Sequence, residues 1–192
     1  MNILFVYADP PEDWNSSEYR CRIPCDAINK YTQHKALMVC VRDLDKLVRI
    51  SPWADAFIME RNYFGDIPNI LKYFHQLYPT KAYIATFDDG YHYITRDNPG
   101  YLFWKMKKIK MADGSMIKVD FDPLKVFVET LRLFDCAFVP NKLLASDYAP
   151  YTKTIYFPNY QDSEVYLDVP KIRNDGKLVI GWGAAVHMCA HW

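Results

Sequence analysis

Short runs of apolar residues recur along the chain, and segments whose apolar residues have helical spacing separate them. Most runs are nearly continuous rather than alternating, which is typical of strands in a sheet that is covered on both faces. The runs predict strands at 3–8, 35–41, 54–60, 81–87, 136–140 and 153–158. The intervening patterns predict helices at about 17–31, 43–50, 66–77, 123–134 and 141–149.

Helix-start signals support this alternation. Ser16 and Ser17 precede the first predicted helix, and Asp122 stands as a cap before Pro123, a residue favoured at the first helical position. Strands and helices that alternate in this way form βαβ units with right-handed crossovers. We therefore expect a doubly wound α/β fold with a mostly parallel, Rossmann-like sheet.

Two segments interrupt the alternation. Residues 88–123 are too long for a plain strand-to-helix loop, and their centre places Asp113 and Gly114 between two apolar and basic flanks, which predicts a β-hairpin insertion. Residues 159–176 are polar and extended, as in a linker.

The second interruption suggests a domain boundary. We predict a complete α/β domain at 1–160 and an interdomain linker at 161–176. A C-terminal extension at 177–192 then reads as the first strand (177–183) and turn of an incomplete second domain.

Composition narrows the classes of function. The 23 Lys and Arg residues balance the 23 Asp and Glu residues, and a net charge of zero argues against a binder of duplex DNA. The sequence contains no run of about 18 apolar residues, so it predicts no membrane span. The apolar stretch at the amino terminus is short and uncharged, so we expect a buried strand there and not a signal peptide. The cysteines are scattered, and Cys21 and Cys25 lack the spacing of common zinc sites, so reduced structural cysteines in a cytoplasmic protein are favoured over a metal or disulfide role.

Open α/β sheets bind ligands beyond the carboxyl ends of their strands. We therefore look for functional residues in the loops that follow the predicted strands. After the first strand, Ser16 and Ser17 stand where the amino terminus of a helix favours a phosphate, and Arg20 and Arg22 follow within a turn as clamps for an anion. The alternative is a simple helix cap beside a solvated arginine.

After the fourth strand come Asp88, Asp89 and His92. Such carboxylates serve as general bases, as hydrogen-bond acceptors for sugar hydroxyls or as metal ligands, while the alternative is one turn cap and one solvated side chain. The ring of Tyr91, in the same aromatic stretch, could stack on a ligand or simply pack.

Two further places carry weaker signals. Glu60 and Arg61 end the third strand, where they could pair with each other or contact an acceptor or a phosphate. Gly181 and Gly183 match the first two glycines of the dinucleotide-binding fingerprint G-x-G-x-x-G, but Val186 stands where the third glycine is required. His187 follows them, and a ligand contact at this glycine turn is favoured over a metal site.

Taken in order, several segments resemble nucleotide-sugar glycosyltransferases of the two-Rossmann (GT-B) type, in the broad retaining family with many bacterial and phage members. The segments are IATFDDGYHYITRDNP after the fourth strand, FDCAFVPNKLLASDY, TIYFPNY and VIGWGAAVH. The family places an Asp-Asp motif where Asp88 and Asp89 stand, and a Pro-Asn exit from its first domain where Pro158 and Asn159 stand.

The resemblance implies transfer of a sugar from a nucleotide-diphosphate donor to an acceptor held by the amino-terminal domain. It implies no metal and no cofactor besides the nucleotide sugar, because helix amino termini and basic groups stabilise the leaving diphosphate. The implied catalytic residues are Asp88, Asp89 and His92. The implied donor-binding residues are Ser16, Ser17, Arg20, Gly181, Gly183 and His187, and the implied acceptor-binding residues are Glu60, Arg61 and Tyr91.

The chain departs from the family pattern at two motifs and in the extent of its second domain. Ser16 and Ser17 replace a glycine pair, and Ala184 and Ala185 replace a Gly-Ser pair. Nearly all of the second domain is also missing, so a partner chain or a second copy would have to complete it. The acceptor could be a glycan, a small molecule or a nucleic acid. The alternative is a non-catalytic α/β binding or assembly module whose strand at 177–183 docks on a partner chain.

Overall fold

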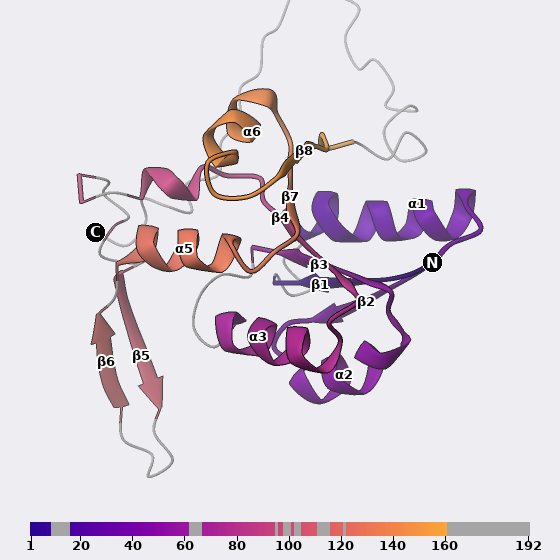
Figure 1. The fold of residues 1–192 in the computed structure, drawn as a ribbon, viewed down its shortest axis with the longest axis horizontal. Coiled ribbons are helices and arrows are strands. Elements are labelled where there is room, and N and C mark those ends of the chain that lie inside the picture. Colours follow the sequence, from indigo (N-terminus) through magenta and orange to yellow (C-terminus); the bar gives the residue numbers. More distant parts are fainter. Residues whose placement is uncertain are drawn as a thin grey trace, which may run out of the picture. The chain divides into compact units, whose positions relative to one another are not determined.

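Six parallel strands form the central sheet in a computed structural model of the protein (Figure 1). Their order across the sheet is β2-β1-β3-β4-β7-β8. The strands are β1 (Asn2–Tyr7), β2 (Lys35–Cys40), β3 (Ala56–Glu60), β4 (Ala82–Thr86), β7 (Cys136–Val139) and β8 (Thr154–Tyr156). Each overlaps one of the predicted runs, and the predicted doubly wound α/β fold is confirmed.

The structure describes residues 1–8, 16–61, 67–94, 96–97, 101, 105–110, 116–120 and 122–160. The chain divides into two compact units, Met1–Tyr160 and Gln161–Trp192. The predicted linker at 161–176 and the predicted extension at 177–192 lie outside the described residues.

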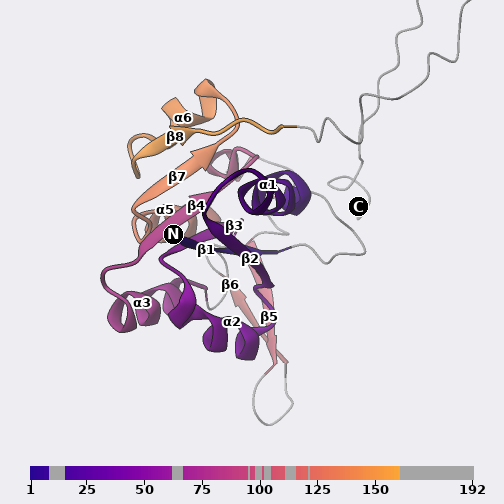
Figure 2. The same cartoon turned by 90° about the vertical axis from the view of Figure 1, so that its right-hand side faces the viewer.

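Helices cover both faces of the sheet, and their positions match the predicted ranges. They are α1 (Ile23–Tyr31), α2 (Leu44–Ile50), α3 (Ile67–Leu77), α5 (Pro123–Leu131) and α6 (Lys142–Tyr148). Figures 1 and 2 show α1 on one face and α2 and α3 on the opposite face. Asp122 acts as the predicted cap of α5, since it accepts a hydrogen bond from the backbone N–H of Lys125 at 3.1 Å.

Successive side chains of each strand point to opposite faces of the sheet, and the core is therefore divided into two clusters. Phe57 and Tyr83 are partners in the register of β3 and β4, and their rings stack at 5.2 Å in the larger cluster, which also contains residues of α2, α3, α5 and α6. Ile58 faces the other way and packs with Cys21 and Cys25 in the smaller cluster beneath α1. These thiols are free and buried, so they pack as small apolar groups.

The predicted hairpin is also confirmed. It consists of β5 (Met106–Lys110) and β6 (Met116–Asp120), which pair antiparallel between β4 and α5 in the sequence. Among the described residues, no helix combines the length and the apolar character that a membrane span requires.

Candidate functional site

Polar residues from distant parts of the sequence gather where the strands of the sheet end. We call the set of Ser17, Arg20, Glu60, Thr86 and Asp88 the carboxyl-edge cluster. Glu60 and Thr86 are the last residues of β3 and β4, and they are partners in the strand register. A helix that follows β1 carries Ser17 and Arg20, and Asp88 follows β4. The topology of parallel strands therefore brings these residues to one edge.

Glu60 is the acidic anchor of this cluster. Its side chain is fully buried, and Oε2 accepts hydrogen bonds from the backbone N–H of Ala8 at 2.9 Å and from Oγ of Ser17 at 2.7 Å. The predicted pair with Arg61 is present, because Arg61 Nε donates to Oε1. A buried carboxylate is tolerated only where donors compensate its lost hydration. Glu60 thus ties the ends of β1 and β3 to the start of the first helix.

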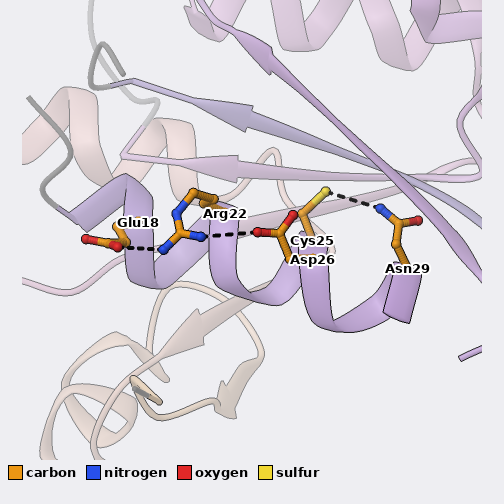
Figure 3. A network of polar contacts seen from close by, with 5 residues as sticks. All are labelled: Glu18, Arg22, Cys25, Asp26 and Asn29. Carbon is orange, nitrogen blue, oxygen red and sulfur yellow. Dashed lines mark hydrogen bonds and ion pairs between the residues drawn. The ribbon is translucent and has the colours of Figure 1, made fainter. Parts of the chain in front are cut away.

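The first helix begins with a π-helical turn, Glu18–Arg22, that continues into α1. Single π turns inside helices are frequent at functional sites. The turn buries Arg20, while Arg22 lies on the outer side, where it donates to Glu18 at 2.6 Å and to Asp26 at 3.2 Å (Figure 3). Arg22, which the sequence offered as an anion clamp, is therefore paired within its own helix.

The two serines at the start of this helix are both buried. Ser16 is 6% exposed and Ser17 is fully buried. In the described part of the chain, the Ser17 side chain donates to Glu60 and does not cap the helix. The hydroxyl of Ser17 is thus engaged with a carboxylate at the position for which the sequence offered a phosphate contact or a helix cap.

Arg20 links the cluster to the segment that leaves the sheet after β8. Its side chain is 1% exposed, and Nε donates to Oγ1 of Thr86 at 2.7 Å. Nη1 donates to the carbonyl oxygen of Phe157 at 2.6 Å and to Oδ1 of Asn159 at 3.0 Å. Burial lowers the pKa of Arg20 to about 10, and the nearby Asp88 carboxylate opposes this effect most strongly, so the guanidinium stays charged at neutral pH.

Two polar atoms of the cluster are buried without a hydrogen-bond partner among the described residues. They are Nη2 of Arg20, a donor, and Oδ1 of Asp88, an acceptor. Native proteins pair most buried polar atoms, because an unpaired one loses its hydration without compensation. The cluster therefore holds one donor and one acceptor that a bound group could satisfy.

Asp89 differs from Asp88 in its surroundings. Its side chain is exposed, yet partial desolvation raises the pKa of its carboxyl, and the adjacent Asp88 adds to the rise while Arg61 opposes it. A carboxyl with a raised pKa is a better proton acceptor once it is ionised.

His92 and Tyr91 lie in the same loop but make different contacts. His92 Nε2 is 3.2 Å from Oδ2 of Asp147, and burial lowers the pKa of the imidazole although Asp147 opposes this effect. The ring of Tyr91 is 5% exposed, and it packs at 5.6 Å from Phe87 and 5.9 Å from Phe127, inside the larger core cluster. Packing, one of the two roles considered for this ring, is thus present.

Sequence reasoning missed three residues that organise this region. Thr86 is a polar residue that ends an apolar strand, and that position was the available signal. Asp147 and Tyr148 end α6, in the segment that carries the family resemblance, but neither has a pattern that assigns a role.

The remaining predicted site residues, Gly181, Gly183 and His187, lie outside the described residues. Across the ranges that the structure describes, no three His, Cys, Asp or Glu side chains come together in a way that could hold a metal ion. A scan against protein-family models finds no match to the chain, and searches of the curated proteins and of the solved structures find none either.

Proposed function

We propose that this chain is the acceptor-binding half of a glycosyltransferase, and that the carboxyl-edge cluster binds hydroxyl groups of its substrate. The observation that carries the proposal is the buried pair of unpartnered atoms, Nη2 of Arg20 and Oδ1 of Asp88. A hydroxyl group both accepts and donates hydrogen bonds, so hydroxyls can satisfy the donor and the acceptor alike. Each bond to a charged group contributes about 1.5–3 kcal/mol.

The charges of this region favour an uncharged polyol over a phosphate. The acidic residues Glu60, Asp88 and Asp89 outnumber the basic residues Arg20 and Arg61. Like charges at close range repel, so this excess of carboxylates disfavours a phosphate in the region. This balance supports the acceptor side of the reaction, while donor contacts of Ser16, Ser17 and Arg20 stay a prediction from the sequence.

The proposed reaction needs one bond formed and one broken. The acceptor oxygen bonds to the anomeric carbon of the donor sugar as the bond from that carbon to the diphosphate breaks. The electron pair of the broken bond leaves with the nucleoside diphosphate. The acceptor hydroxyl loses its proton to Asp89, whose raised pKa suits a general base, and Asp88 orients that hydroxyl.

Replacement of Asp88 tests this proposal. Asp88→Asn keeps the shape of the side chain but removes its charge, and charged hydrogen bonds are about twice as strong as neutral ones. We expect it to weaken ligand binding by about tenfold, equivalent to about 1.4 kcal/mol, with a change in melting temperature of at most about 4 °C. The measurements are calorimetric titration with a panel of nucleotide sugars and methyl glycosides, and product analysis after incubation of donors with acceptors.

The matched control is Asp45→Asn, which removes an exposed carboxylate in the first turn of α2. It should bind every ligand of the panel as the original chain does. The proposal fails if no member of the panel binds to the original chain. It fails equally if Asp88→Asn and Asp45→Asn bind with the same affinity.

A further inference from the structure

The loop that carries the two aspartates is attached to the end of a single helix. We call residues 88–94 the acidic loop. Tyr148, the last residue of α6, donates a hydrogen bond from its hydroxyl to the carbonyl oxygen of Asp89 at 2.7 Å. The same hydroxyl accepts a hydrogen bond from the backbone N–H of Tyr91 at 3.1 Å. One side chain thus spans the backbone of the loop from Asp89 to Tyr91.

The ring of Tyr148 is held rigidly. It is fully buried, and it packs at 5.2 Å from Phe127 and at 5.9 Å from Phe87. Burial raises the pKa of the Tyr148 hydroxyl, so it remains a protonated donor throughout the neutral range. Phe87 directly follows strand β4 and Phe127 belongs to α5, so two parts of the fold hold the ring. The position of the ring in turn fixes the position of its hydroxyl.

Asp147, the neighbour of Tyr148, holds the second half of the loop. Its Oδ2 accepts a hydrogen bond from the hydroxyl of Tyr93 at 3.0 Å and lies 3.2 Å from Nε2 of His92. Gly90 allows this arrangement, because a Cβ at that position would stand 2.6 Å from Cδ2 of Tyr93. Contacts to α6 therefore hold the acidic loop on both sides of Gly90.

We propose that Tyr148 is a positioning residue that fixes the backbone of Asp88 and Asp89 at the carboxyl edge of the sheet. Neither its ring nor its hydroxyl reaches the surface, so it acts through the loop and not by contact with a ligand. The importance of this role for catalysis rests on the proposed function. The positioning itself is independent of it.

The test compares Tyr148→Phe with Tyr83→Phe. Tyr83 is an equally buried tyrosine, and its hydroxyl donates to the carbonyl oxygens of Phe74 at 2.8 Å and Tyr78 at 3.2 Å, away from the acidic loop. Each substitution removes a buried hydroxyl and leaves its ring in place. We expect both variants to lose a similar amount of stability, so stability alone does not distinguish positioning from packing.

The distinguishing measurement is the titration of the Asp89 carboxyl by carbon-13 NMR. In Tyr148→Phe the acidic loop should become more mobile and the Asp89 carboxyl better hydrated. The pKa of Asp89 should therefore fall toward the ordinary value of an aspartate. In Tyr83→Phe it should stay where it is in the original chain. The positioning role is wrong if Asp89 titrates identically in all three proteins, or if both variants shift it equally.

A kinetic readout separates this inference from the proposed function. If the chain transfers sugar, Tyr148→Phe should lower kcat at least tenfold with KM changed less than threefold, while Tyr83→Phe leaves both unchanged. A shifted Asp89 titration in a chain that binds no member of the panel would support the positioning role and reject the proposed function. Sugar transfer that persists unchanged in Tyr148→Phe would reject the catalytic importance of Tyr148 but not the proposed function.

Discussion

Glu60 is the side chain that joins three separate parts of the carboxyl edge. Its carboxylate is fully buried and joins the backbone at Ala8, the hydroxyl of Ser17 and the guanidinium of Arg61. Arg61 has a positive φ of 49°, a conformation that L-residues other than glycine adopt at a cost of about 1 kcal/mol or more. The hydrogen bond from its backbone N–H to the carbonyl oxygen of Thr86, at 3.1 Å, helps to hold that conformation.

Glu60→Gln should destabilise the protein by about 2–4 kcal/mol, because it removes the charge from a buried carboxylate that pairs with a guanidinium. The amide nitrogen of the glutamine would also bring a hydrogen-bond donor close to groups that already donate to this side chain, such as the backbone N–H of Ala8 and the hydroxyl of Ser17. The measurement is the free energy of unfolding in urea. Glu129→Gln, at a side chain 60% exposed on α5, is the control and should change it by less than about 0.5 kcal/mol. Equal effects at the two positions would contradict the anchoring role of Glu60.

Among the elements, β2 stands at one edge of the sheet, where unpaired backbone groups invite other strands. Asn29 of α1 occupies part of that edge. Its Nδ2 donates to the carbonyl oxygen of Ala36 at 2.9 Å, and its Oδ1 accepts from the backbone N–H of Ala36 at 2.9 Å. The amide of one side chain thus pairs with the edge as a neighbouring strand would, and it joins α1 to β2.

Asn29→Ala should therefore act on both stability and association. Loss of two hydrogen bonds is expected to lower the free energy of unfolding by about 1–3 kcal/mol. The bare backbone of Ala36 should also promote self-association, which light scattering measures as a function of concentration. Lys30→Ala, at the next, exposed position of the helix, is the control. A monomeric and fully stable Asn29→Ala protein would show that this pair contributes nothing.

The elements were predictable from the sequence because their signals are local. Continuous apolar runs located the strands, and residues such as Asp122 act within a few positions of the helix that they cap. The site was less predictable because its contacts join distant positions. Arg20 meets Thr86 and Asn159 only after the sheet has assembled, and no local pattern indicates that a π turn buries it.

At the same edge, chemistry alone did not separate binding residues from structural ones. The sequence offered Asp88, Glu60 and Tyr91 as site residues, each beside a structural alternative: a turn cap for Asp88, a pair with Arg61 for Glu60 and packing for Tyr91. The structure distinguishes them by their partners: Glu60 is paired and Tyr91 is packed, while Oδ1 of Asp88 has no partner among the described residues. Burial and pairing depend on the assembled fold, so they could not be read from spacing.

At the scale of the whole molecule, the unit Met1–Tyr160 contains the six-stranded sheet and both core clusters. The last residues of this unit also belong to its structure. Phe157 donates from its backbone N–H to the carbonyl oxygen of Val139 at 2.8 Å, and its ring lies 5.2 Å from that of Phe138. Phe157 and Asn159 further supply acceptors for Arg20, whose guanidinium lies 5.2 Å from the Phe157 ring.

These contacts predict how the position of a truncation affects stability. A chain that ends at residue 160 should fold cooperatively, as followed by circular dichroism during urea unfolding. A chain that ends at residue 156 lacks both acceptors of Arg20 Nη1 and should be less stable by about 3 kcal/mol or more, because each hydrogen bond to a charged group contributes about 1.5–3 kcal/mol. Asn159→Ala in the longer chain removes one acceptor and should give an intermediate stability. Equal stability of the two truncated chains would show that Arg20 does not depend on this segment, and the buried guanidinium would then need compensation from elsewhere in the fold.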